Sequence, residues 1–279
     1  MIPQKNLSLL ANRLLKEGGG TRIQEKVLER DYCISWILAG LDTVPLKDKI
    51  VFKGGTALKK CYFKDYRFSE GLDFTLTSEL SFEEILAGLN PVYEFIKKSS
   101  NISLGFSRVD KDTHQNSHTF YLSYDGPLPK KELRELKVDI TIKEKMIESP
   151  VNMPLLSYPE YFDVPQPAKV RVYSLNEISV EKTAALVDRA RNEARDLYDM
   201  WYLIENGSVN IGNLSGAIRE KIGFRGKKIE EIRDEFIKKE MRLEKLWNER
   251  LSHQMVKLPE FNDVYRLVKK EFRKAGLDD

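Results

Sequence analysis

One short segment constrains the fold of this chain more than any other, because it predicts four structural elements in close succession. Residues 50–52 form an apolar run that is typical of a buried strand, and the Gly-Gly-Thr of residues 54–56 predicts a tight turn directly after it. Residues 57–62 continue with a helical pattern. In residues 72–77 apolar and polar side chains alternate strictly, which indicates a half-buried strand.

The glycine turn is a candidate for phosphate binding. Glycines after a strand let the backbone approach a phosphate closely, and the helix that follows offers free N–H groups to an anion. Gly54, Gly55 and Thr56 are therefore candidate nucleotide-binding residues. An ordinary tight turn is the alternative interpretation. The turn is not a Walker A loop, because no Gly-Lys-Ser/Thr sequence closes it.

Two aspartates lie on the polar faces of predicted strands. Asp73 belongs to the alternating run above, and Asp139 belongs to a second run at 133–142. One such carboxylate alone would usually be a solvated residue at a strand edge. Two of them beside a glycine turn are what metal-dependent phosphoryl chemistry requires, because hard oxygen ligands hold Mg²⁺ and the metal neutralises a triphosphate.

The remaining sequence predicts an α+β chain with two lobes. We expect a mixed sheet with flanking helices over residues 1–165 and a helical lobe over residues 166–279. Five of the eleven prolines lie in 149–172, which predicts an irregular crossing between the lobes. The other expected strands are 102–109 and 118–124, and the expected helices are 7–16, 22–41, 81–98, 174–189, 193–204, 212–222, 226–250 and 260–274.

Composition excludes several classes of protein. Among 279 residues, 32% are charged and the net charge is only +3, which argues against a chain that binds polyanions over its whole surface but permits a local basic face. In 226–250 lysines and arginines alternate with acidic residues, so a solvated helix face and an RNA-facing surface are both possible. We expect a cytoplasmic protein without a membrane partner, because no signal peptide or membrane-spanning run is present.

Cysteine and histidine spacing gives little support for a zinc site. Cys33 and Cys61 do not form a Cys-x-x-Cys pair, which excludes zinc-finger and disulfide-scaffold classes. His114 and His118 have the spacing of a zinc pair on a helix, but they lie in a polar turn between predicted strands. Surface histidines are the favoured interpretation.

Ordered blocks of sequence resemble the AbiEii-type nucleotidyltransferase toxin family. The blocks run, in order, Glu29-Arg30-Asp31-Tyr32, Phe52-Lys53-Gly54-Gly55-Thr56-Ala57-Leu58, Arg67-Phe68-Ser69-Glu70, Leu72-Asp73-Phe74, Leu136-Lys137-Val138-Asp139-Ile140, Glu181-Lys182-Thr183-Ala184-Ala185-Leu186 and Arg195-Asp196-Leu197-Tyr198-Asp199. Several blocks in the expected order are far more specific than any one alone. The resemblance implies a fold like that of DNA polymerase β, and usually the toxin of a toxin–antitoxin pair.

The resemblance also implies an activity and its ligands. Members of the family transfer nucleotides from NTP to RNA, in several cases to tRNA acceptor ends. The expected ligands and partners are therefore NTP, Mg²⁺ or Mn²⁺, RNA with tRNA foremost, and a cognate antitoxin.

Specific residues of this chain take roles through the same resemblance. Gly55 with Thr56 or Ser69 would contact the triphosphate, beside Gly54. Asp73 and Asp139 would bind metal, with Asp139 activating the attacking hydroxyl. The resemblance further implies that Lys182 would hold phosphate oxygens, with Arg189 and Asp196 also binding the nucleotide. Asp196 or Asp199 would help to complete the site, and Lys182 and Asp199 would join the two metal ligands as catalytic residues.

Alternatives exist for this last group. Lys182 and Arg189 are seven residues apart, so one helix could present both on one face. A lysine on a helix is usually solvated, however. Arg195 and Asp199 are four residues apart and could form a local ion pair.

Gly71 is the departure from the family pattern, which has Asp-x-Asp where this chain reads Gly71-Leu72-Asp73. Residues two apart on a strand face the same side, so a carboxylate at position 71 would share a metal with Asp73. Glu70 faces the opposite side and cannot replace it. The substitution predicts weak metal binding and reduced transfer, and it is compatible with a degenerate member and with an active toxin disabled by substitution. A nucleotide- or RNA-binding pseudoenzyme and a protein held by an antitoxin are the rival functions.

Overall fold

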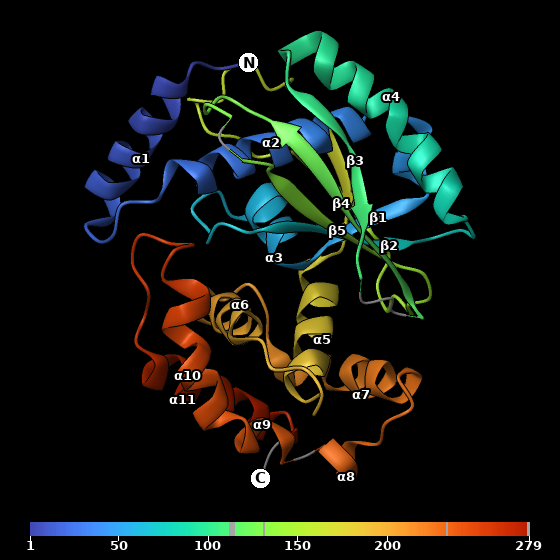
Figure 1. Cartoon of the computed structure of the whole chain (residues 1–279). Coiled ribbons are helices and arrows are strands. Elements are labelled where there is room, and N and C mark those ends of the chain that lie inside the picture. Colours follow the sequence, from blue (N-terminus) through green and yellow to red (C-terminus); the bar gives the residue numbers. More distant parts are fainter. Residues whose placement is uncertain (112–114, 131, 233, 278–279) are drawn as a thin grey trace. The chain divides into compact units, whose positions relative to one another are not determined.

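The chain divides into two compact units, each with its own core. The computed structural model describes residues 1–111, 115–130, 132–232 and 234–277. Unit 1 comprises residues 1–144 and 150–173, and unit 2 comprises residues 145–149 and 174–279 (Figure 1). The division follows residue 173, whereas we expected it after residue 165. The reason is that the segment between them still forms a strand of the sheet in unit 1.

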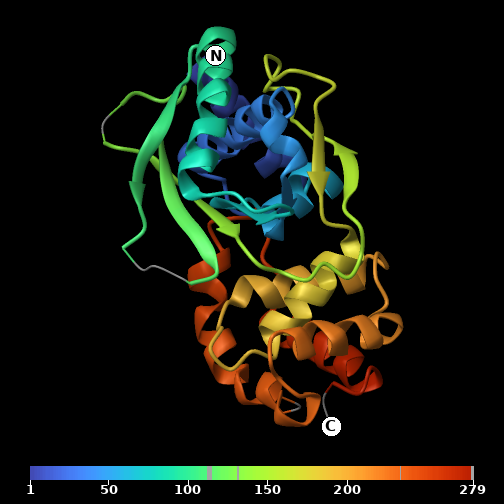
Figure 2. The same ribbon diagram turned by 90° about the vertical axis from the view of Figure 1, so that its right-hand side faces the viewer.

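Unit 1 is built on one mixed sheet. Within the described residues the sheet has seven strands, in the order β3-β4-β5-β2-β1-β7-β6. Figure 2 shows β6 and β7 at the opposite end of the sheet from β3 and β4. The strands are β1 (Ile50–Lys53), β2 (Gly71–Leu76), β3 (Ser103–Val109), β4 (Ser117–Asp125), β5 (Glu135–Thr141), β6 (Val151–Pro154) and β7 (Lys169–Val172).

The sheet has an apolar face and a polar face, as the alternating sequence predicts. β2 runs antiparallel to β1 and parallel to β5, and its Leu72, Phe74 and Leu76 are buried. Helices α2 (Glu25–Leu41) and α4 (Phe82–Ser100) pack on each other, and a Cβ on Gly40 of α2 would lie 2.8 Å from a methyl group of Val92. The remaining helical segments of unit 1 are α1 (Gln4–Gly18), η1 (Pro45–Asp48), α3 (Gly54–Ala57) and the π-helix η2 (Leu58–Tyr62).

Unit 2 is helical throughout its described residues. A fully buried ion pair joins Glu177 and Lys221 at 2.9 Å, and the second carboxylate oxygen of Glu177 accepts backbone N–H bonds from Ile147 and Glu148. The helices are α5 (Leu175–Leu186), α6 (Ala194–Glu205), η3 (Ile211–Leu214), α7 (Ser215–Phe224), α8 (Ile229–Ile232), α9 (Glu235–Lys238), α10 (Glu240–Leu251) and α11 (Phe261–Lys274).

Specific hydrogen bonds attach residues 145–149 to the helices of unit 2. Glu177 accepts the two N–H groups named above, and the Lys221 ammonium donates to the carbonyl oxygen of Lys145 at 2.5 Å. The Ser174 hydroxyl donates to the Glu148 carboxylate at 2.5 Å. These bonds explain why this short segment belongs to unit 2.

The structure confirms the predicted α+β class and corrects three details. Residues 149–172, expected to be irregular, contain β6 and β7, and β7 pairs in parallel with β1. The helix expected over 226–250 is divided into α8, α9 and α10. The helix expected to continue to residue 189 ends at Leu186. Cys33 and Cys61 are buried free thiols.

Candidate active site

Four polar side chains lie in one row across the sheet of unit 1. In the strand register Lys53 is opposite Asp73, Asp73 is opposite Asp139, and Asp139 is opposite Thr119. Residues opposite each other in adjacent strands project from the same face of a sheet. The structure thus brings the two predicted carboxylates together on one face, in neighbouring parallel strands.

Gly54 is required at the end of this row. Its φ of +79° lies in the region that favours glycine, and a Cβ at this position would lie 2.8 Å from Oδ2 of Asp73. The turn after β1 therefore brings backbone next to the Asp73 carboxylate, where a side chain would collide. The sequence predicted a close approach of this backbone to a phosphate, and the group that the structure places beside it is the Asp73 carboxylate.

The hydroxyl of Thr56 has a structural role that the sequence did not reveal. Thr56 is 1% exposed, and its Oγ1 lies 2.6 Å from the carbonyl oxygen of Gly71 and 2.6 Å from Oγ of Ser69. These contacts fix the start of β2 and the hydroxyl of Ser69. Since Ser69 is only half-buried, it is the more accessible of the two hydroxyl groups.

Gly71 is packed more tightly than a missing side chain suggests. It lies opposite Lys137 in the ladder between β2 and β5, and a Cβ on Gly71 would be 3.0 Å from the Lys137 carbonyl oxygen. A side chain at position 71 therefore requires β5 to move by a few tenths of an ångström. The position faces the same side as Asp73, as the alternation predicts.

The residues of this row fit one divalent metal ion that arrives with a nucleotide. Mg²⁺ is commonly held by one or two carboxylates together with substrate phosphates and water. Asp73 and Asp139 are both half-buried, and the Asp139 carboxylate accepts a hydrogen bond from the Thr119 hydroxyl at 2.8 Å. The described part of the chain contains no group of three or more His, Cys, Asp or Glu side chains that could enclose a metal alone.

Lys53 and Thr119 are members of the row to which sequence reasoning assigned no role. Lys53 is 9% exposed, its Nζ donates to Oγ1 of Thr141 at 3.0 Å, and it lies 5.8 Å from the centre of the Tyr173 ring. Lys53 places a positive charge in the strand beside Asp73. Its position before Gly54 was visible in the sequence, but its neighbours depend on the register of the strands.

In unit 2 the structure brings together three more of the predicted residues. Nζ of Lys182 lies 2.5 Å from Oδ1 of Asp196 and 2.7 Å from Oδ2 of Asp199. All three side chains are buried, so the alternative interpretation of Lys182 as a solvated surface lysine is wrong. Burial raises the pKa of Asp196, but the charges of Arg191 and Lys182 outweigh burial and hold that pKa well below its usual range.

Arg189 lies in the turn after α5 and not on the helix that carries Lys182. Because α5 ends at Leu186, Arg189 lies in the turn, where it is exposed, and the expected shared helix face with Lys182 does not form. The turn is held by Lys239, which is buried and donates to the carbonyl oxygens of Leu186, Asp188 and Arg191. Burial lowers the pKa of Lys239 to about 8.

Arg195, Asp199 and His118 each have a partner that the sequence did not indicate. Arg195 forms an ion pair with Glu193 at 3.2 Å, and Asp199 forms one with Lys182. The ring of His118 stacks on Phe82 at 5.4 Å between ring centres. His114, the other member of the possible zinc pair, lies outside the described residues.

Comparisons with known proteins agree with the fold and with the ordered blocks of sequence. A family model described as nucleotidyl transferase AbiEii toxin, type IV TA system, matches residues 36–274. Among solved structures the chain is similar to MenT4, a nucleotidyltransferase toxin from Mycobacterium tuberculosis, with a TM-score of 0.56 and 16% sequence identity over 96% of this chain and 94% of that chain. At that identity the likeness concerns the fold. No curated protein matches the chain.

Proposed function

Because the chain belongs to the AbiEii nucleotidyltransferase toxin family, we propose that it transfers a nucleotide from NTP to RNA, with tRNA as the expected acceptor. We further propose that it is the toxin of a toxin–antitoxin pair, neutralised by a cognate antitoxin in the cytoplasm. Among the described residues, no helix combines the length and apolarity that a membrane span needs. The observation that carries the proposal is the pairing of Asp73 with Asp139 beside the Gly54 turn.

In this proposal the row in unit 1 binds the reacting end of the nucleotide. Asp73 and Asp139 hold Mg²⁺ or Mn²⁺, which when bound neutralises triphosphate charge and polarises the attacked phosphorus. Asp139 also accepts the proton of the attacking RNA hydroxyl, whose oxygen bonds to the α-phosphorus as pyrophosphate leaves. Thr119, which donates to Oδ2 of Asp139, leaves the other oxygen of that carboxylate to do so.

The glycine turn and its neighbours position the phosphates. Gly54 and Gly55 offer backbone N–H groups where the chain passes close to Asp73. Ser69 is the hydroxyl that reaches a phosphate oxygen, and buried Thr56 orients it. Lys53 adds a positive charge at the end of the row, which opposes the negative charge of a triphosphate.

The buried cluster of unit 2 supplies the remaining predicted residues. Lys182 is the proposed phosphate ligand, and its ion pairs with Asp196 and Asp199 orient its ammonium group. Arg189, exposed in the turn after α5, is the proposed second cation for the nucleotide. Asp199 completes the set of residues that we assign to catalysis, with Asp73, Asp139 and Lys182.

Gly71 bears on the rate in this proposal. One carboxylate fewer leaves the metal held by two protein ligands, so we propose that transfer by this chain is impaired. The test is Gly71→Asp, which should increase Mg²⁺-dependent transfer of label from NTP to RNA and increase toxicity in cells. A Cβ at position 71 would lie 3.0 Å from the backbone carbonyl oxygen of Lys137, so folding of the variant is verified before transfer is measured. Absence of both NTP binding and labelling in Gly71→Asp would refute the catalytic proposal.

Gly71 also favours a second candidate, a pseudoenzyme that binds nucleotide or RNA without transfer. Titration calorimetry of the unaltered chain with NTP and Mn²⁺ separates the two. Tight binding without turnover supports the pseudoenzyme, while turnover supports the enzyme. A chain that binds neither ligand but binds its antitoxin would support an interaction protein.

A further inference from the structure

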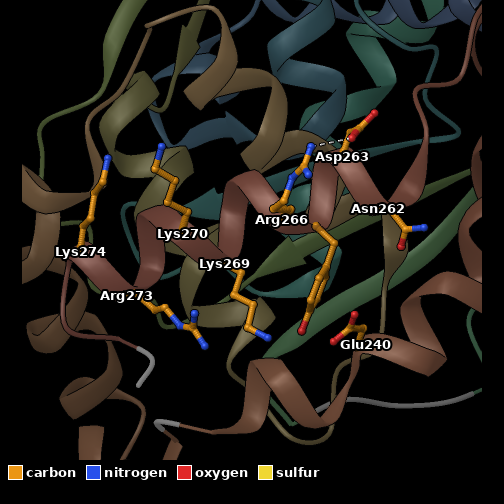
Figure 3. A pocket seen from close by; sticks show the side chains of 9 residues that line it. Glu240, Asn262, Asp263, Arg266, Lys269, Lys270, Arg273 and Lys274 are labelled. Carbon is orange, nitrogen blue, oxygen red and sulfur yellow. Dashed lines mark hydrogen bonds and ion pairs between the residues drawn. The ribbon is translucent and has the colours of Figure 1, made fainter.

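Basic side chains gather on the last helix of unit 2. α11 carries five of them in two rows with a spacing of four residues: Arg266, Lys270 and Lys274 form the longer row, and Lys269 and Arg273 form the shorter one. At a rise of 1.5 Å per residue the longer row is about 12 Å long. Figure 3 shows the helix crossing the view with these side chains spread to both sides of its axis.

These side chains line a groove, which we call the α11 groove. Its volume is about 630 Å³, and its lining consists of the five cations with Glu240, Asn262, Asp263 and Tyr265. Five cations and two carboxylates give the lining a net charge of +3. The whole chain of 279 residues has the same net charge of +3. The rest of the chain is therefore balanced, and this groove is a local basic face.

Four of the five cations of the groove are exposed, and Lys269 is half-buried. Arg266 pairs with Asp263 at 3.0 Å and Lys274 with Glu271 at 2.7 Å, but surface pairs of this kind contribute little and exchange readily for another anion. The opposite side of α11 is buried and packs on α6, the helix that carries Asp196 and Asp199. The groove thus has a firm base on the helix of the candidate site.

The other basic stretch of unit 2 is used differently. Within 226–250, Lys227 pairs with Asp188 at 2.6 Å, and Lys238 pairs with Glu235 at 2.9 Å. Lys239 is buried beneath the turn after α5. Acidic residues alternate with the basic ones throughout this stretch, so it presents no uninterrupted basic row, and its exposed ion pairs are of the same weak kind as those of α11. α11 is the better candidate for that role.

We propose that the α11 groove binds the phosphate backbone of the RNA that accepts the nucleotide, an inference that rests on the proposed function. A nucleic acid presents several phosphates along a row of about 12 Å, and lysine and arginine bind them with release of counterions. Such contacts position the nucleic acid without reading its sequence. The groove thereby orients the acceptor while leaving the choice of base to other contacts.

The lining favours RNA over an acidic protein. Protein interfaces are usually centred on accessible apolar or aromatic side chains that become buried. Among the nine lining residues the aromatic one, Tyr265, is already buried, and the others are charged or polar. A polyanion that is charged along its whole length fits this lining better than a protein surface.

Binding can be tested without NTP, by fluorescence anisotropy with a fluorescein-labelled RNA hairpin that has a single-stranded 3′ end. The variant is Lys269→Ala with Lys270→Ala. The matched control is Arg242→Ala with Lys245→Ala, which removes the same charge from exposed positions of α10 outside the groove. We expect the α11 variant to bind about tenfold more weakly at 100 mM salt, with the slope of log Kd against log salt reduced by about 1.5. The control should stay within about twofold of the unaltered chain.

Three binding results would overturn the inference. They are equal RNA affinity of the α11 variant and the control, no RNA binding by the unaltered chain at 50 mM salt, and an α11 variant that no longer binds polyglutamate but still binds RNA. The last would assign the groove to an acidic protein. If the α11 variant loses RNA binding but no variant transfers label, the groove stands and the proposed function fails. If transfer occurs with an unchanged KM for RNA in the α11 variant, the groove fails and the proposed function stands.

Discussion

Lys60→Met tests the contribution of the buried ion pair between Lys60 and Asp31 to the stability of unit 1. Lys60 in η2 and Asp31 in α2 are each 2% exposed, and Nζ of Lys60 lies 2.7 Å from Oδ1 of Asp31 and 2.8 Å from Oγ of Ser35. Methionine is of similar length and removes the charge together with the N–H donor that bonds Ser35. Asp31 is then left as a buried carboxylate without its cation.

The size of the effect follows from this burial. Removing one partner of a buried pair costs about 3–5 kcal/mol, because the remaining charge stays desolvated and unpaired. Replacing both partners with apolar residues often restores stability. We therefore expect Lys60→Met to lower the free energy of unfolding of unit 1 by about 3–5 kcal/mol. Lys60→Met with Asp31→Leu should regain most of that loss.

Urea unfolding of unit 1 alone can be followed by fluorescence. The chain has three tryptophans, and Trp36 belongs to unit 1, so Trp201→Phe and Trp247→Phe leave it as the sole reporter. Lys98→Met, at an exposed position of α4, is the control and should change stability by less than about 0.5 kcal/mol. A loss below about 1 kcal/mol in Lys60→Met, or a double variant less stable than the single one, would refute the reasoning.

Three other predictions concern single positions. Gly54→Ala should destabilise unit 1 by more than Gly207→Ala destabilises unit 2. Both positions have a positive φ, but a Cβ at Gly54 would also lie 2.8 Å from Asp73, whereas nothing lies within 4 Å of a Cβ at Gly207. Urea unfolding of both variants measures the difference. Burial lowers the pKa of Lys59 to about 7, so between pH 7 and 10.5 the unfolded state binds one more proton than the folded state, and the free energy of unfolding should rise with pH. Lys59→Met should remove up to about 1.4 kcal/mol per pH unit from that slope. Parallel plots of unfolding free energy against pH for the variant and the unaltered chain would contradict the prediction. Lys239→Met should destabilise unit 2 by about 2–4 kcal/mol, because the carbonyl oxygens that it bonds lose a buried donor; an unchanged unfolding midpoint would contradict it.

The sequence predicted the polar faces of β2 and β5 because strand alternation is a local property. Asp73 and Asp139 therefore appeared as candidates without knowledge of the fold. That they lie opposite each other depends on strand order and register, which are set by packing between distant segments. The same register adds Lys53 and Thr119, whose positions no local pattern distinguishes.

Other features depend on contacts far along the chain. The burial of Lys182 arises from two aspartates on the next helix, and the end of α5 at Leu186 is accompanied by bonds from Lys239, more than fifty residues later. No glycine or proline at that point signals the end of the helix. The strands β6 and β7 were missed because prolines dominate their surroundings, although an edge strand such as β6 can end in proline.

The most direct test of the central claim is transfer of label from NTP to RNA by matched variants of Asp139. In the Gly71→Asp background, Asp139→Asn removes the proposed base and metal ligand while keeping its size, and Asp125→Asn removes a carboxylate at the end of β4 as the control. We predict that Asp139→Asn lowers Mg²⁺-dependent transfer by at least about a hundredfold while Asp125→Asn leaves it unchanged. Equal transfer by the two variants would contradict the assignment of the active site to this row.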